Sequence, residues 1–559
     1  MDMKERILKH VNHLVAIPSV SNTAEEAGAA RYLGNSLGAQ AYFKANPQLT
    51  GQFPIPGDSL GRTAAYGLIL GNGPRTLVLT GHYDVVDTEE YGGFRDFAYD
   101  VAAWQQVSGR QREELLQMLT PQAAEDLESG EWLFGRGSND MKGGLAIGLA
   151  LMEEIGDRCL SGDVPDGNLL FLAVADEEAY SAGMRAASAL LAELAGRCGL
   201  EYSCLIDLEP CFGQGGKQEV HIGSVGKLLP AVLVQGAKAH VVECFGGLNA
   251  VGVLAQLFMD TELAPEFAES CHGEMCPPPT WFNLRDRKEG YDVSVPLRAA
   301  GYMSVLGFEK TAGTVMKRLG ELGRQAFSKY LERMRNQARA LGGESSGMEE
   351  MIPAVDLDSC VLEYRELEKI TSKKMGNAAF AQWREQQYRE AGEKIHAGEW
   401  SYPQATLEMM DRLLTCSGIT VPVMVLAFAP PYYPAYHSDR IPGREGEGSA
   451  AYELLRASAL EKRGIQLEKW NYFCGISDLS YCGGLEGDAV LDYGSDTPLW
   501  GSLYSMDQES MNRVQIPALL FGPVGMDAHQ MGERVNIRSL TEDVPEILLE
   551  FIGRMFGER

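Results

Sequence analysis

Apolar residues occur along the chain in two spacings that predict strands and helices in turn. Continuous apolar runs at 76–80 and 169–175 predict buried strands, and helical apolar spacing is found around 145–155 and 183–195. Strands that alternate with helices in this way are typical of a parallel sheet covered by helices. The sequence therefore predicts an α/β fold with a mainly parallel sheet flanked by helices.

A change of pattern after the first 210 or so residues predicts a second domain. Glycines are frequent from 213 to 226, and the strands that follow lead to one long amphipathic helix near 311–341. Further buried strands predict that the first domain then resumes; they lie near 423–428, 465–472 and 518–521. We expect a smaller α+β domain inserted in the main domain, with the main domain at 1–222 and 369–559 and the insert at 223–368.

Length and charge limit the classes of protein that fit. A chain of 559 residues exceeds what one hydrophobic core usually organises. The formal net charge of −28 disfavours nucleic acid, which requires a concentrated positive surface. No apolar run reaches the length of a membrane span, and residues 1–13 lack a secretory signal. We expect a cytoplasmic protein that binds neither nucleic acid nor membrane, with no disulfide among its cysteines.

Histidines and carboxylates follow four of the predicted strands. They are His82 and Asp84, then Glu177 and Glu178, then Asp207 and Glu209, and finally His529. The carboxyl edge of a parallel sheet is where sites form in open α/β folds. A carboxylate two residues from a ligating imidazole can accept its second ring N–H, as Asp84 could from His82. We expect these side chains to lie close together.

A glycine-rich loop at 134–144 supplies one more acid, Asp140, well placed to bridge two cations. A loop of this kind before a helix could instead hold phosphate. However, the loop lacks the Gly-Lys-Ser/Thr ending of a nucleotide-binding P-loop. A metal-binding loop is the better interpretation.

Oxygen and imidazole ligands without clustered thiolates suit zinc, manganese or cobalt. Adjacent glutamates such as Glu177 and Glu178 diverge, so one can bind metal while the other takes a proton from the attacking water. A separate structural metal at 271–276, which holds two cysteines, a histidine and a glutamate, is sterically cramped. His437 receives no role.

The order of these motifs resembles the ArgE/DapE/aminoacylase/carboxypeptidase G family of dinuclear zinc hydrolases. The matching pieces, in order, are VAIPSVSNTAEE, TGHYDVVD, FGRGSNDMKGG, VADEEAYSAG, LIDLEP, GAKAH with GLNA, CGISDLSY and GPVGMDAHQMGERVNI. Together they cover both predicted domains. A helical insertion at 88–131 and a long second domain are similar to the RocB-like, arginine-utilisation branch.

This resemblance implies a role for each candidate residue. Asp140 would bridge two divalent metal ions, most commonly zinc, with cobalt or manganese as alternatives. Glu178 and His529 would complete one ion, and His82 and Glu209 the other. Glu177 would be the general base, and Asp84 would orient His82. Asp207 stays an alternative to Glu209 because Cys211 replaces a threonine of the family pattern. The Asp140–Met141 peptide bond would be cis.

The resemblance also implies a lid and dimerisation role for the inserted domain. His240 would then reach an active site, often that of the partner subunit in a homodimer, and polarise the scissile carbonyl. The implied activity is metal-dependent hydrolysis of an amide bond in a small peptide or N-acyl amino acid, in arginine or other amino-acid catabolism. The alternative is a non-catalytic metal-binding or assembly protein with the same fold, although such a protein would not need Glu177.

Overall fold

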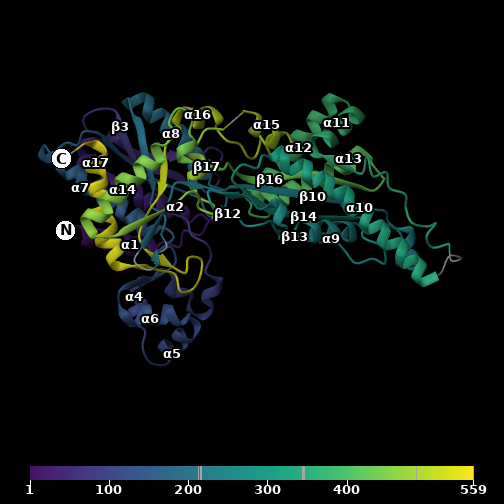
Figure 1. Cartoon of the computed structure of the whole chain (residues 1–559), viewed down its shortest axis with the longest axis horizontal. Helices are drawn as coiled ribbons and strands as arrows, with labels where there is room; N and C mark the ends of the chain where they lie inside the picture. Colours follow the sequence, from purple (N-terminus) through teal and green to yellow (C-terminus); the bar gives the residue numbers. More distant parts are fainter. Residues whose placement is uncertain (212, 215–216, 343–346, 486, 558–559) are drawn as a thin grey trace. The chain divides into compact units, whose positions relative to one another are not determined.

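The computed structural model describes residues 1–211, 213–214, 217–342, 347–485 and 487–557 (Figure 1). The chain forms two compact units. The first comprises residues 1–224, 436–484 and 507–559, and the second comprises 225–435 and 485–506. Within the described residues, no helix is both long and apolar enough to cross a membrane.

The first unit is built on a nine-stranded sheet. Its order along the main path is β1 (Thr50–Pro54), β2 (Thr63–Ile69), β5 (Asn168–Val174), β3 (Arg75–His82), β6 (Glu201–Asp207), β19 (Ala518–Leu520), β8 (Lys217–His221) and β18 (Gln466–Trp470), with β7 (Gly213–Gln214) beside β8. The central strands β5, β3, β6 and β19 run parallel. The predicted α/β fold with a mainly parallel sheet is confirmed. The carboxyl ends of β3, β5 and β6 meet at one edge.

Helices cover this sheet because their apolar faces are buried against it. They are α1 (Met3–Val15), α2 (Glu26–Ala39), α3 (Ala41–Ala45), α7 (Lys142–Ser161), α8 (Ala182–Cys198), α14 (Glu447–Arg463), α16 (Gln508–Val514) and α17 (Val544–Phe556). Helix α7 is buried over most of its length and packs on β3. It begins directly after the glycine-rich loop, so its packing fixes the position of that loop.

Residues 88–131 form the predicted helical insertion of the first unit. It consists of η2 (Glu89–Tyr99), α4 (Val101–Gln106), α5 (Gly109–Met118) and α6 (Pro121–Ser129) (Figure 1). A cluster of buried apolar residues that includes Tyr91, Trp104 and Leu127 forms the core of the insertion. The chain then enters a small sheet made by β4 (Trp132–Phe134), β21 (Arg534–Asn536) and β20 (Gly525–Met526).

The second unit contains a five-stranded sheet covered by helices. Its order is β13 (Thr280–Asp286), β14 (Arg298–Gly307), β10 (Gly226–Gln235), β16 (Val423–Tyr433) and β15 (Val361–Glu363). The helices are α9 (Ala250–Thr261), α10 (Ala312–Gly342), α11 (Tyr364–Met375), α12 (Asn377–His396), α13 (Tyr402–Ser417) and α15 (Gly487–Ser495). The predicted long helix is therefore present as α10.

The second unit is longer than the insert expected at 223–368. Strand β16, which we expected in the resumed first domain, pairs with β10 over 227–235. Its apolar residues are buried as predicted, but apolar character alone does not determine which sheet a strand joins. The first unit resumes near 436 and not at 369.

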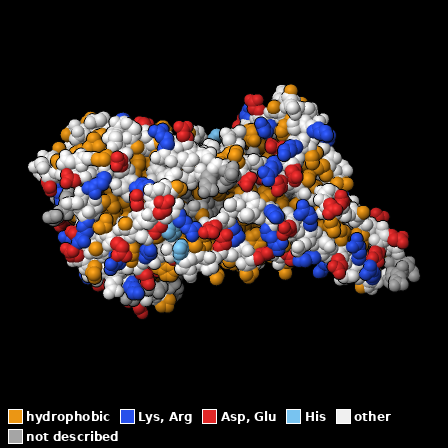
Figure 2. All heavy atoms as spheres, turned by 45° about the horizontal axis from the view of Figure 1, so that its top comes forward, with side chains coloured by type: hydrophobic (Ala, Val, Ile, Leu, Met, Phe, Trp, Pro, Cys, Tyr) orange, Lys and Arg blue, Asp and Glu red, His pale blue; other side chains and the backbone are white. Residues whose placement is uncertain are grey.

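On the face shown in Figure 2, acidic side chains are interspersed with Lys and Arg among the described residues.

Candidate metal centre

His82 ends β3, and its imidazole faces several carboxylates. The side chain is 1% exposed, and its Nε2 lies 3.0 Å from Asp140 Oδ1 and 3.1 Å from Glu209 Oε1. Its Nδ1 lies 3.0 Å from the backbone carbonyl oxygen of Asp84. The tautomer that donates Nδ1–H to this carbonyl leaves Nε2 free to bind a metal ion. Sequence position and geometry therefore agree on His82 as a candidate ligand.

Asp84 contacts the acidic turn as well as His82. Its carboxylate accepts hydrogen bonds from the backbone N–H groups of Glu177 and Glu178, at 3.1 and 3.2 Å, and from the hydroxyl of Ser21 at 2.7 Å. The nearest carboxylate oxygen lies 3.5 Å from His82 Nδ1, farther than the carbonyl oxygen of the same residue. The Asp84 carboxylate thus ties the turn after β5 to the end of β3.

Asp140 lies between the two candidate histidines. Its Oδ1 faces His82, and its Oδ2 lies 3.2 Å from His529 Nε2. The same His529 nitrogen lies 2.8 Å from Glu178 Oε1. The Asp140–Met141 peptide bond is cis, as the resemblance implied. One carboxylate thus presents a separate oxygen to each histidine, which is the arrangement that a bridging ligand requires.

Donor atoms of the first unit form two groups that could each hold a metal ion. One consists of His82, Asp140 and Glu178, and the other of His82, Glu177 and Glu209. Asp207, the alternative to Glu209, is in neither group among the residues that the structure describes. Asp207 is buried at the end of β6, two residues before Glu209. The geometry favours Glu209 over Asp207.

The electrostatics of the cluster suit bound cations. Burial raises the pKa of Glu209 to about 7, and it raises the pKa of Glu177 well above its usual range. Hydrogen bonds to Asp140 and Glu178 raise the pKa of His529 to about 10. Buried carboxylates are costly unless a positive charge compensates them. Two divalent ions would supply that charge, and the imidazole and carboxylate donors are of the type that zinc, manganese and cobalt accept.

Residues 78–406 match the family model described as Peptidase family M20/M25/M40. The chain belongs to this family. The chain is 30% identical to the uncharacterized protein YqjN of Bacillus subtilis (strain 168), over 98% of this chain and 95% of that protein. It is 25% identical to protein RocB of the same organism, over 96% of this chain and 92% of RocB. The predicted family and branch are confirmed.

One solved structure is similar in fold over nearly the whole chain. The crystal structure of a tripeptidase from Staphylococcus aureus subsp. aureus mu50 superposes with a TM-score of 0.50, covers 99% of both chains and is 13% identical. This likeness shows the fold. Membership of the M20 family confirms the predicted class of protein, a metal-dependent hydrolase of amide bonds that acts on peptides or similar small substrates.

Two acids of this M20 chain interact with candidate residues of the site although no role was predicted for them. Asp478, in the short helix η6 (Asp478–Tyr481), is buried, and burial raises its pKa to about 7. Glu533 accepts hydrogen bonds from the backbone N–H groups of Asn139 and Asp140, at 3.3 and 3.2 Å. Neither acid follows a strand directly, so the strand-end pattern could not find them. Their only sequence signal is their place in the motifs CGISDLSY and GPVGMDAHQMGERVNI.

His240 belongs to the second unit. It precedes η3 (Val241–Gly246), is exposed, and its Nδ1 accepts a hydrogen bond from the N–H of Val242 at 3.3 Å. Its catalytic role stays a prediction. His437, in the first unit, is buried with its ring 5.0 Å from that of Tyr472. It belongs to neither donor group of the described residues.

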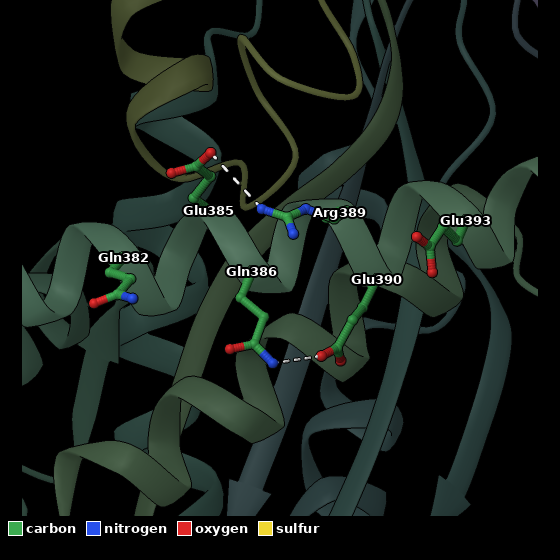
Figure 3. Close-up of a pocket in the computed structure, with 6 residues that line it drawn as sticks. All are labelled: Gln382, Glu385, Gln386, Arg389, Glu390 and Glu393. Carbon is green, nitrogen blue, oxygen red and sulfur yellow. Dashed lines mark hydrogen bonds and ion pairs between the residues drawn. The ribbon is translucent and has the colours of Figure 1, made fainter.

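A surface pocket in the second unit is separate from this chemistry. It lies along α12 and is lined by six residues, all from that helix: Gln382, Glu385, Gln386, Arg389, Glu390 and Glu393 (Figure 3). Two pairs form among these side chains: Gln386 donates to Glu390 at 2.9 Å, and Arg389 lies 3.9 Å from Glu385. A pocket lined by one solvated helix face offers no convergent catalytic groups, so it is not the site.

Proposed function

We propose that this M20 hydrolase cleaves an amide bond in a small peptide or an N-acyl amino acid with two zinc ions bound. Asp140 would bridge the ions, with Glu178 and His529 on one side and His82 and Glu209 on the other. The observation that carries this proposal is the position of Asp140, whose two oxygens lie 3.0 and 3.2 Å from the two histidines. The bound ions would lower the pKa of water and polarise the carbonyl group.

Glu177 is the proposed general base. Its Oε2 lies 3.9 Å from His82 Nε2, whereas Glu209 Oε1 lies 3.1 Å away, so Glu209 is the better ligand. The Glu177 carboxylate takes a proton from the attacking water as the water oxygen bonds to the carbonyl carbon. It then gives that proton to the leaving nitrogen, and the C–N bond breaks to leave a carboxylic acid and an amine. The second proton of the water passes from the acid to the amine, so the products are a carboxylate and an ammonium group.

The backbone around Glu177 supports this role. The Asp84 carboxylate accepts hydrogen bonds from the backbone N–H groups of Glu177 and Glu178. These bonds fix the turn that carries the proposed base Glu177 and the proposed ligand Glu178. The preceding Asp176 lies 2.7 Å from the guanidinium of the buried Arg62 and accepts the N–H of Ala182 at 3.2 Å. A base held in one geometry by several hydrogen bonds loses little of its proton-transfer efficiency to motion.

A homodimer in which His240 completes the partner's site is the proposed assembly. The exposure of His240 on a segment before η3 supports it, since a residue that reaches another subunit must be accessible. The proposed setting in arginine or other amino-acid catabolism rests on the likeness to protein RocB. Deacylase and dipeptidase activities differ only in the groups that flank the amide.

A substrate screen with controlled metal content tests the proposal. Metal-free protein would be loaded with zinc, cobalt or manganese and assayed against dipeptides and N-acyl amino acids. We expect hydrolysis that depends on two equivalents of metal. Hydrolysis by metal-free protein at the rate of loaded protein would contradict the proposed function.

A further inference from the structure

The helical insertion at 88–131 packs against the segments that carry two candidate ligands. Its apolar cluster includes Trp104 and Leu115 of the insertion and also Phe134 and Met531 from outside it. Phe134 begins the loop of Asp140, and Met531 follows His529 by two residues. The insertion therefore shares its core with the segments that carry Asp140 and His529. Packing of its helices can thus influence where these two side chains lie.

Glu90 of the insertion begins a chain of contacts that ends at Asp140. Its carboxylate pairs with the guanidinium of Arg136, which also pairs with Glu533. Glu533 in turn accepts the backbone N–H of Asp140 at 3.2 Å. Arg136 is 1% exposed and Glu533 is fully buried, so the middle of this chain lies out of solvent. We call these contacts the Glu90 arm.

Asp126 of α6 begins a second chain of contacts, which ends beside His529. Its Oδ2 accepts hydrogen bonds from Arg534 at 2.6 and 2.7 Å. Arg534 also pairs with Asp527 at 2.5 Å, two residues before His529. The Arg534 guanidinium is 1% exposed and lies over the rings of Trp132 and Phe134. We call these contacts the Asp126 arm.

We propose that the insertion positions the metal ligands, with Glu90 acting on Asp140 and Asp126 acting on His529. This inference rests on the two-metal site of the proposed function. It assigns a positioning role to the insertion at 88–131. Buried guanidinium groups need charged partners, since removal of one partner leaves an uncompensated buried charge. Without Glu90, Arg136 would reorient and weaken the contact of Glu533 with the Asp140 backbone. Without Asp126, Arg534 would reorient and weaken its contact with Asp527, two residues before His529.

The two arms predict different losses. Asp140 would serve both ions, so the E90Q variant should bind both zinc ions more weakly. His529 would serve one ion, so D126N should weaken one binding event and leave the other unchanged. Loss of a group that orients a ligand typically costs about 10–100-fold in metal affinity, and we expect that range.

Calorimetric titration of metal-free protein with zinc tests this proposal without any substrate. Matched controls are E89Q, next to Glu90, and E125Q, next to Asp126, because both side chains are exposed on the same elements. Thermal unfolding of each metal-free variant is measured in parallel. Weaker zinc binding at an unfolding midpoint equal to that of the control would support the positioning role.

Equal zinc affinities in variant and control would overturn the proposal. So would a loss of affinity that appears only together with a lower unfolding midpoint of the metal-free protein, because that result indicates damage to the fold alone. If the unmodified protein binds fewer than two zinc ions, the proposed function fails, and the positioning role fails with it. The two failures are thus told apart by the unmodified protein.

Discussion

Replacement of Glu177 by glutamine separates the proposed base from the ligands. The variant keeps the size of the side chain and the backbone N–H that Asp84 accepts at 3.1 Å. It removes only the ability to take a proton. General base catalysis contributes about 10²- to 10⁴-fold, so kcat should fall by that factor, or about 3–5 kcal/mol in the barrier.

Metal content should stay at two equivalents in E177Q. Glu177 Oε2 lies 3.9 Å from His82 Nε2, against 3.1 Å for Glu209, so the variant leaves the closer ligand in place. The assay is single-turnover hydrolysis combined with elemental analysis of the same sample. A matched control is E193Q on α8, where the side chain is 56% exposed and pairs with Arg197.

Two results would refute the reasoning for E177Q. A kcat within about tenfold of the unmodified protein would mean that another group takes the proton. Loss of one metal equivalent together with activity would make Glu177 a ligand, as its membership of the second donor group allows. The control should keep both kcat and metal content in either case.

Three further predictions concern the other candidate residues. E209Q should lose one metal equivalent while D207N keeps two, measured by elemental analysis; the reverse would make Asp207 the ligand. Inactive H240A mixed with inactive E177Q should regain part of the hydrolysis through heterodimers, and no recovery despite confirmed subunit exchange would remove His240 from the partner's site. The pKa of His529 is raised to about 10 in the metal-free protein. Its charge therefore stabilises that protein fully below pH 6.5 and less as pH rises toward 10, so the stability deficit of metal-free H529A should shrink over this range. A stability deficit of H529A that grows with pH would contradict the raised pKa of His529.

The strand-end pattern was sufficient to predict which of the candidate side chains lie close together. His82, Glu178 and Glu209 each follow a parallel strand, and parallel strands bring their carboxyl ends to one edge whatever the rest of the fold. The loop of Asp140 precedes the buried helix α7, which places it at the same edge. These positions depend on local pattern and topology, both of which a sequence records.

Long-range pairing could not be predicted from the same patterns. Strand β16 is apolar and buried as expected, yet it joins the sheet of the second unit. Arg534 and Asp126 are 408 residues apart in sequence, and only the folded chain brings them together.

A local contact of His82 was also not predicted. Its Nδ1 lies closest to the backbone carbonyl oxygen of Asp84, whereas the sequence pattern indicated the Asp84 carboxylate as its partner.

The positions of bound zinc test the central claim most directly. Anomalous scattering at the zinc edge, from crystals of zinc-loaded protein, would locate each ion. We predict two ions, with one oxygen of Asp140 on each, His82 and Glu209 on the first and Glu178 and His529 on the second. A single ion, or two ions with Asp140 in contact with neither, would contradict the account.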